Sequence, residues 1–302
     1  MKKTIGIDIG GTKIAAGIVY EDGKIEHEVV IRSNVETRDG MFDSLLEAID
    51  QVIEKSGLLP EEISFGIGVP GLVDSEAGVA IFQNNLPWEN FPLKEKLMIA
   101  YPSCQSVAIN NDVYQAALAE WYSNDVSEND TLVFFTISTG VSTAIVKSGE
   151  FLKGAGFAGE VGLLPIEKDD EGNWLRLESL TSGNALADIA RTKYNDGMVD
   201  GEELFDLYRS QDPIAVEIIE TWSERIAYGL YTTQTMIDPN LIILGGSVIQ
   251  KNPDVLSLIK EKLEKFLIDV QKDRLDKIVV TQLNNQAGLL GAGFSGIYQG
   301  RK

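Results

Sequence analysis

Residues 4–13, Thr-Ile-Gly-Ile-Asp-Ile-Gly-Gly-Thr-Lys, decide the fold of this chain. Isoleucine occupies every second position before the paired glycines, which is the pattern of a strand with one buried face. Gly10 and Gly11 interrupt the pattern, and apolar residues return at 14–20 and 25–31. We therefore expect a β-meander whose first turn contains the two glycines.

Strand and helix patterns alternate along the rest of the chain. Helical spacing of apolar residues predicts helices at 40–55, 91–100, 113–121, 182–194, 213–236, 256–267 and 288–298. Apolar runs predict strands at 63–69, 107–110, 131–137, 143–147, 241–244 and 278–281. The order of strands and helices before the polar segment 123–130 resembles the order that begins after it, so we expect two similar α/β halves.

Composition argues against several classes of function. The 302 residues include 46 acidic and 26 basic side chains, and the net charge of −20 disfavours nucleic acid and anionic membranes as partners. One cysteine and one histidine exclude a disulfide framework and a multi-cysteine or histidine-rich metal site. No 18 apolar residues run together and the start of the chain lacks an export signal, so we expect a cytoplasmic protein.

Three turns that follow predicted strands contain residues suited to phosphate binding: Gly10-Gly11-Thr12, Ser138-Thr139-Gly140 and Gly245-Gly246. Glycine lets backbone N–H groups approach an anion, and threonine adds a hydroxyl donor. Asp8, just before the first turn, has the chemistry to hold a hydrated Mg²⁺ ion. The first turn alone is also consistent with an ordinary glycine-rich hairpin, but three such turns in one chain favour a polyphosphate ligand.

Asp112 stands between a predicted strand and a predicted helix, after Asn110 and Asn111. A carboxylate at such a point is suited to accept a proton from a substrate hydroxyl. The plainer alternative, which the residue type alone favours, is that Asp112 is the N-cap of the helix that begins at Val113. The residues alone leave both hypotheses open.

Seven segments, taken in order, resemble the ROK family of bacterial sugar kinases and related repressors. They are residues 5–13 (IGIDIGGTK), 68–74 (GVPGLVD), 85–93 (NLPWENFPL), Asn111-Asp112, 154–162 (GAGFAGEVG), Glu178 with Ser182-Gly183, and 288–292 (GLLGA). The resemblance spans the whole chain. It implies an actin-like (ribonuclease H-like) ATPase fold in which two similar α/β domains flank a cleft: residues 1–122 with the C-terminal helix 287–302, and residues 123–286.

The resemblance also implies phosphoryl transfer from ATP with Mg²⁺ to a sugar hydroxyl, usually at C6. Asp112 would be the catalytic base, and Asp8 would act through the Mg²⁺ ion. The residues that it implies for the nucleotide are Asp8, Gly10, Gly11, Thr12, Lys13, Thr139, Gly140, Gly245, Gly246 and Gly288. Those that it implies for the sugar are Gly71, Asn85, Asn111, Asp112, Glu160 and Glu178.

Two departures from the family pattern bear on the substrate and on activity. Leu163 stands where most members have a histidine that contacts the sugar, and residues 169–174 replace a cysteine-rich zinc module. We therefore expect no zinc, and a larger substituted sugar such as a β-glucoside. Ser138, Ser142 and Ala144 replace glycines of the second phosphate loop, which leaves a catalytically weak or silent sugar-binding or regulatory protein as an alternative.

The remaining expectations concern partners. The resemblance implies a homodimer. The first predicted strand begins within five residues of Met1, so we expect no DNA-binding segment of the kind that the family's repressors carry. An actin-like ATPase that acts on protein partners is a third hypothesis, opposed by Asn111-Asp112 and Glu160, which such a protein would not need.

Other conspicuous residues have plain structural explanations. We expect an exposed His27, an inert thiol at Cys104 and a solvated acidic loop at 167–171. Trp121 and Trp222 lie in helical patterns and are expected in the core. Trp88 has two hypotheses: it stacks on a sugar ring, or it fills the domain interior.

Overall fold

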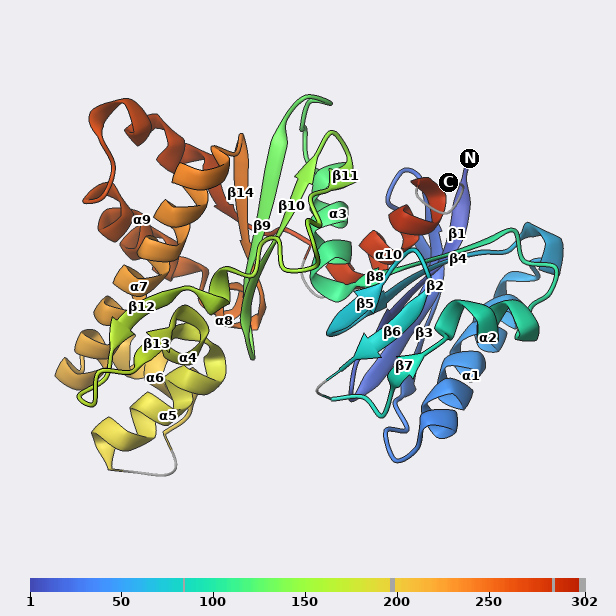
Figure 1. The fold of residues 1–302 in the computed structure, drawn as a ribbon, viewed down its shortest axis with the longest axis horizontal. Coiled ribbons are helices and arrows are strands. Elements are labelled where there is room, and N and C mark those ends of the chain that lie inside the picture. The colour runs from blue at the N-terminus through green and yellow to red at the C-terminus, as the bar shows by residue number, and fades with distance from the viewer. Residues whose placement is uncertain (84, 196–198, 284–285, 299–302) are drawn as a thin grey trace. The chain divides into compact units, whose positions relative to one another are not determined.

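The computed structural model describes residues 1–83, 85–195, 199–283 and 286–298 (Figure 1). The chain divides into two compact units, unit 1 (Met1–Val126 with Leu283–Lys302) and unit 2 (Ser127–Gln282). The domain boundaries expected from the sequence, at 122/123 and 286/287, remain a prediction. None of the helices in the described ranges is long and apolar enough to cross a membrane.

Unit 1 is built on a five-stranded sheet in the order β3-β2-β1-β4-β8. Its strands are β1 (Lys3–Ile9), β2 (Lys13–Tyr20), β3 (Ile25–Arg32), β4 (Ser64–Val69) and β8 (Ser106–Asn111). The first three are antiparallel, which confirms the expected meander, and β1, β4 and β8 run parallel. The helices are α1 (Arg38–Ser56), α2 (Leu93–Ala100), α3 (Asp112–Ser123) and α10 (Ala287–Tyr298), with a single 3₁₀ turn at Pro60–Glu62.

Successive residues of β1 alternate between the two faces of this sheet. Ile5, Ile7 and Ile9 are fully or almost fully buried in the core that includes Met41 and Leu45 of α1. Gly6 and Asp8 point to the opposite face, where α10 packs on β1 and β4. A Cβ on Gly6 would lie 3.0 Å from the backbone nitrogen of Gly293, so the glycine of the opening motif lets α10 approach the sheet.

Unit 2 repeats the same strand order, β11-β10-β9-β14-β15, with the same directions (Figure 1). Its strands are β9 (Thr131–Ile137), β10 (Val141–Lys147), β11 (Glu150–Phe151), β14 (Leu241–Gly245) and β15 (Ile278–Val280). The α-helices are α4 (Leu177–Thr181), α5 (Gly183–Tyr194), α6 (Gly201–Arg209), α7 (Pro213–Ile237), α8 (Ser247–Lys251) and α9 (Leu256–Glu264). Short 3₁₀ helices lie at Val161–Leu163, Pro253–Val255 and Asp269–Lys277. The duplicated plan confirms the two similar α/β halves expected from the sequence.

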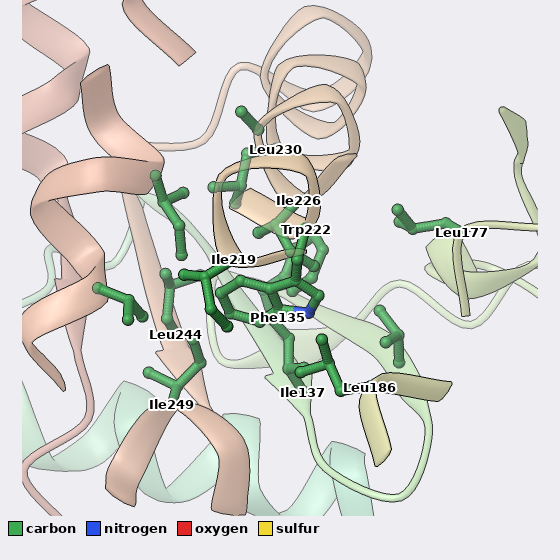
Figure 2. Packing of buried hydrophobic residues seen from close by; sticks show 14 of the residues in the cluster. Phe135, Ile137, Leu177, Leu186, Ile219, Trp222, Ile226, Leu230, Leu244 and Ile249 are labelled. Carbon is green, nitrogen blue, oxygen red and sulfur yellow. The ribbon is translucent and has the colours of Figure 1, made fainter. Parts of the chain in front are cut away.

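Helix α7 supplies one side of the core of unit 2. Asp212 is its N-cap, accepting from the N–H groups of Ile214 and Ala215, and Pro213 is its first residue, as the sequence predicts. Trp222 of α7 is buried, and its Nε1 donates to the carbonyl of Thr181 at 2.8 Å. Figure 2 shows this indole beside Phe135 of β9 in the hydrophobic cluster.

The sequence patterns missed the shortest elements. A three-stranded sheet in unit 1 consists of β5 (Leu72–Asp74), β6 (Val79–Phe82) and β7 (Glu89–Phe91). In unit 2, β12 (Pro165–Lys168) and β13 (Trp174–Arg176) form a hairpin. Elements of two to five residues are too short for a period to be visible, so their positions depend on tertiary contacts.

Two expectations about single segments need correction. Trp88 is 1% exposed, stacks on Phe91 at 4.6 Å between ring centroids, and donates from Nε1 to the carbonyl of Arg38. The sugar-stacking hypothesis is therefore wrong, because no face of this indole is open. The acidic segment 167–171 is not simply a solvated loop, because Glu167 lies in β12 and makes a bidentate ion pair with Arg225, at 2.7 and 2.9 Å.

Candidate active site

The carboxyl ends of parallel strands in unit 1 bring Asp8 and Asp112 close together. Asp8 pairs with Gly68 across β1 and β4, and β8 leads directly into Asp112. A Cβ on Gly68 would lie 3.6 Å from Oδ1 of Asp8 and 3.8 Å from Cα of Asp112. Gly288 of α10 completes this edge, since its Cβ would lie 2.6 Å from Cγ of Asp8. Ligands of open α/β sheets commonly bind at this edge.

Asn111, and not Asp112, is the N-cap of α3. Its Oδ1 accepts from the N–H of Val113 at 2.8 Å, and its Nδ2 donates to the carbonyl of Gly71 at 2.7 Å. Asp112 is the first helical residue, and its Oδ1 also approaches the Val113 N–H at 3.0 Å. The N-cap hypothesis for Asp112 is therefore wrong. The two bonds of the Asn111 side chain hold it against Gly71 and fix the position at which α3 begins, with Asp112 as its first residue.

Burial makes both carboxyl groups hard to ionise. It raises the pKa of Asp8 to about 6, with the charge of Asp112 adding to the rise and Lys13 opposing it. Burial also raises the pKa of Asp112, against the lowering effect of the backbone N–H groups of Val113 and Asp112 itself. Two neighbouring buried carboxyl groups whose negative charge is only partly compensated favour a bound cation or proton.

The same edge fits an Mg²⁺ ion only in part. Within the described ranges, no three histidine, cysteine, aspartate or glutamate side chains gather to hold a metal ion. Asp8 is thus suited to share an Mg²⁺ ion with the oxygens of a bound polyphosphate rather than to hold it in a cage of protein ligands.

A buried polar network beneath the edge went unnoticed in the sequence. Nε2 of Gln115, one turn after Asp112, donates to the carbonyl of Ile67 at 3.0 Å. Asn110 donates from Nδ2 to Oγ of Ser295 at 3.0 Å and accepts from Ser75 at 2.9 Å. These bonds tie α3 to β4 and β8 to α10. The available signal was a polar residue at helical spacing from Asp112 inside an apolar pattern.

The first glycine turn connects β1 and β2 beside Asn85. The N–H of Gly10 donates to the carbonyl of Lys13 at 2.9 Å, which closes the turn, and Oγ of Ser33 donates to the carbonyl of Gly10. A Cβ on Gly11 would lie 3.0 Å from the backbone oxygen of Asn85. Thr12 and Lys13 are exposed. The structure thus brings together a residue predicted for phosphate and one predicted for the sugar.

In unit 2, two distant segments of the chain approach the turn that begins at Ser138. The carbonyl of Ser138 accepts from the N–H of Gly183 at 2.7 Å, and its hydroxyl lies 3.0 Å from that of Ser247. Gly246 has a φ of 86° and approaches the backbone of Ile137, where a Cβ would lie 2.6 Å from the carbonyl carbon. The turns predicted at Thr139-Gly140 and Gly245-Gly246 are therefore neighbours.

A pocket of about 210 Å³ lies next to this convergence. It is lined by residues of α5, α6 and α8 and by two residues that flank these helices: Gly183, Leu186, Asp200, Gly201, Glu202, Phe205, Ser247, Val248, Lys251 and Asn252. Its mixed polar and apolar wall suits a nucleoside. Sequence reasoning missed this wall, because α6 carries no glycine motif. Gly288, also predicted for the nucleotide, lies in unit 1 against Asp8.

The two predicted sugar-binding glutamates of unit 2 are bonded to consecutive residues of β10. Oε2 of Glu178 accepts from the N–H of Val141 at 2.8 Å, and Oε2 of Glu160 accepts from Oγ of Ser142 at 3.2 Å. Both glutamates are exposed. Neither bond was foreseen from the sequence.

Two α/β sheets of identical plan, with glycine turns at their strand ends, define a protein of the actin-like ATPase fold. The sequence matches the model of the ROK family over residues 4–294, so the chain belongs to that family.

Named relatives agree with this assignment. The chain is 29% identical to a glucokinase of Streptomyces coelicolor, over 97% of this chain and 96% of that protein. It is 28% identical to a β-glucoside kinase of Klebsiella pneumoniae, over 96% and 94%. Its fold matches the crystal structure of a ROK family glucokinase from Streptomyces griseus in complex with glucose and AMPPNP, with a TM-score of 0.78, 28% identity, and coverage of 97% and 99%.

Proposed function

We propose that this chain is an ATP-dependent sugar kinase that transfers the γ-phosphoryl group of ATP to a sugar hydroxyl. The observation that carries the proposal is the placement of Asp112 beside Asp8 at the sheet edge. Asn111, and not Asp112, is the N-cap of α3. The relatives named glucokinase and β-glucoside kinase, and the related structure with glucose and AMPPNP, support the same activity.

Asp112 acts as the general base in this proposal. It accepts the proton of the attacking hydroxyl, a contribution that is typically about 10²–10⁴-fold in rate. Burial raises its pKa and therefore strengthens it as a base once it is ionised. Position in the first turn of α3 places the carboxylate near helix N–H groups, which favours the ionised form before proton transfer.

Asp8 and the turns hold the nucleotide. Asp8 would bind an Mg²⁺ ion, which neutralises charge on the phosphates during transfer. N–H groups of Gly10, Gly11 and Thr12, with the side chain of Lys13, would contact phosphate oxygens. Thr139-Gly140 and Gly245-Gly246 would do the same from unit 2, with the nucleoside in the pocket beside Ser247.

In unit 1, the side chains of Asn85 and Asn111 and the backbone of Gly71 would bind sugar hydroxyls. In unit 2, Glu160 and Glu178 would do the same. Contacts of this kind reject analogues that lack a hydroxyl most sharply. Leu163 is 42% exposed and lies in the 3₁₀ helix that follows Glu160. We propose transfer to C6 of a hexose or a β-glucoside, and the open apolar side chain of Leu163 suits the apolar substituent that a β-glucoside carries.

The three residues that replace glycines of the second phosphate loop, and that suggested a catalytically silent protein, have structural roles. Ser142 donates to Glu160, the hydroxyl of Ser138 pairs with that of Ser247, and Ala144 is fully buried. These contacts give the three residues structural roles, and the relatives named as kinases favour a working enzyme over a silent one. The Mg²⁺ ion, a homodimer, a cytoplasmic location and the lack of nucleic-acid or membrane partners remain parts of the proposal that rest on the resemblance and the composition.

The experiment is a coupled assay of ADP release with hexoses, N-acetylhexosamines and β-glucosides as acceptors. The proposal predicts turnover with at least one acceptor, and a Leu163→His variant that prefers the unsubstituted hexose more than the parent does. Binding of a sugar without turnover by any acceptor would favour the silent alternative.

A further inference from the structure

The second phosphate turn is held at both of its ends by one segment of unit 2. At the start of the turn, the carbonyl of Ser138 accepts from the N–H of Gly183 at 2.7 Å. At the end of the turn, the N–H of Val141 donates to Oε2 of Glu178 at 2.8 Å. Segment 178–183 therefore clamps the turn from one side.

The clamp is tightly packed. A Cβ on Gly140 would lie closer than 3 Å to the carboxylate, at 2.7 Å from Oε2 of Glu178. On the other side, a Cβ on Gly162 would lie 3.2 Å from Cβ of Glu178. The absence of side chains at Gly140 and Gly162 is thus what lets this carboxylate reach the Val141 N–H.

The backbone of Glu178 is itself fixed. Leu177 is fully buried and its N–H donates to the carbonyl of Leu164 at 2.8 Å. The carbonyl of Glu178 accepts from the N–H of Ser182 at 3.0 Å, next to the Gly183 that holds Ser138. The carboxylate is therefore presented to the turn from a rigid support, although the side chain is exposed.

We propose that Glu178 is a positioning residue for the nucleotide: its carboxylate holds the Ser138–Val141 turn in the conformation that binds phosphate. This inference rests on the proposed function and deepens it. A carboxylate has about four acceptor sites, so the bond to Val141 leaves capacity for a sugar hydroxyl. Sugar and nucleotide binding are then linked through one side chain, and the neighbouring bond from Ser142 to Glu160 extends the link to the second glutamate.

The test is the affinity for AMPPNP with Mg²⁺ in the absence of sugar, measured by calorimetry on the full chain. Glu178→Ala is expected to weaken binding about 5–10-fold, because the turn loses a charge-assisted hydrogen bond. Glu178→Gln is expected to stay within about 3-fold of the parent, because its amide oxygen still accepts from the Val141 N–H. If the charge of Glu178 alone mattered, both variants would bind AMPPNP more tightly than the parent, because removing a negative charge favours binding of an anion.

Glu171→Ala is the matched control, because it removes the same charge from an exposed turn of unit 2. It is expected to leave AMPPNP affinity unchanged. Amide hydrogen exchange supplies a second readout: the Val141 amide is expected to be protected in the parent and in Glu178→Gln, and to exchange faster in Glu178→Ala with an unchanged melting temperature.

The outcomes separate the two claims. If the parent binds AMPPNP and Glu178→Ala binds it equally or more tightly, the positioning role is overturned while the kinase proposal stands. If the parent binds no nucleotide, the proposed function fails and the inference falls with it.

Discussion

Gly288 at the start of α10 lies directly against the carboxylate of Asp8. A Cβ at position 288 would lie 2.6 Å from Cγ and 2.9 Å from Oδ1 of Asp8, closer than van der Waals contact allows. Gly68 pairs with Asp8 across the sheet, and a Cβ there would lie 3.6 Å from Oδ1 of the same carboxylate. The position of Asp8 therefore depends on a missing side chain in a segment far away in the sequence.

Gly288→Ala is expected to lower kcat/KM by about 10–100-fold, because a displacement of about 1 Å in a positioning group has effects of that size. The same overlap outweighs the better helix propensity of alanine, so the free energy of unfolding is also expected to fall, by about 1–3 kcal/mol. Steady-state kinetics and urea unfolding check the two parts. In an Asp8→Asn background the same substitution is expected to have no further kinetic effect; an additive loss would contradict the contact.

Asp8→Asn is expected to stabilise the protein in the absence of Mg²⁺ and nucleotide. The folded state keeps the Asp8 proton up to a pKa of about 6, while the unfolded chain loses it near the usual 3.8. The folded state therefore binds more protons between these values, and the parent loses stability as pH rises from about 4 to 6.

The Asp8→Asn variant lacks this loss. Its excess free energy of unfolding over the parent therefore grows as pH rises from about 4 to 6 and levels off above about pH 6. One pKa unit corresponds to about 1.4 kcal/mol, so the advantage is at most about 3 kcal/mol. Urea unfolding at several pH values measures it. An advantage that is the same at pH 4 and pH 7 would refute the buried-charge explanation. The variant is also expected to lose turnover.

Asn111→Ala removes the N-cap of α3 and the bond to Gly71. Loss of a side-chain cap costs about 0.5–2 kcal/mol of unfolding free energy. Thr37→Ala is the matched control, since Thr37 caps α1 by accepting from the N–H of Gly40. Both variants are expected to lose similar stability, but only Asn111→Ala is expected to lose most of its kcat/KM. Equal kinetics in the two variants would show that Asn111 serves the helix alone.

Gly66→Ala tests how α10 is attached to the sheet of unit 1. A Cβ on Gly66 would lie 2.7 Å from the backbone nitrogen of Gly296 and equally close to the carbonyl carbon of Ala292. Backbone at that distance cannot yield, so we expect a loss of about 3 kcal/mol or more in unfolding free energy. Chemical denaturation measures the loss; a variant as stable as the parent would mean that α10 packs less closely than described.

The regular part of the fold could be predicted from the sequence because its signals are local. The meander of β1–β3 follows from alternating residues, and α7 follows from its spacing together with Asp212 and Pro213. Residues 131–137 were predicted as a strand with the bounds that β9 has. These segments are long enough for periodicity to outweigh tertiary effects.

What could not be predicted depends on contacts between distant segments. Whether Asp112 or Asn111 caps α3 is decided by a side-chain rotamer that also reaches Gly71. The burial of Trp88 depends on Phe91 and the carbonyl of Arg38. The bond from Glu178 to Val141 depends on glycines at two other positions. Local pattern carries none of this information, so the sequence indicated which residues gather but not which atoms bond.

The central claim is that the carboxylate of Asp112 takes the proton of the acceptor hydroxyl. Asp112→Asn keeps the shape of the side chain, and α3 keeps its cap at Asn111. Turnover with the best acceptor sugar is the direct measurement, with AMPPNP affinity taken on the same sample. We predict a fall in kcat of about 10²–10⁴-fold with nucleotide affinity retained. A variant that binds AMPPNP and turns over within a few-fold of the parent would contradict the account.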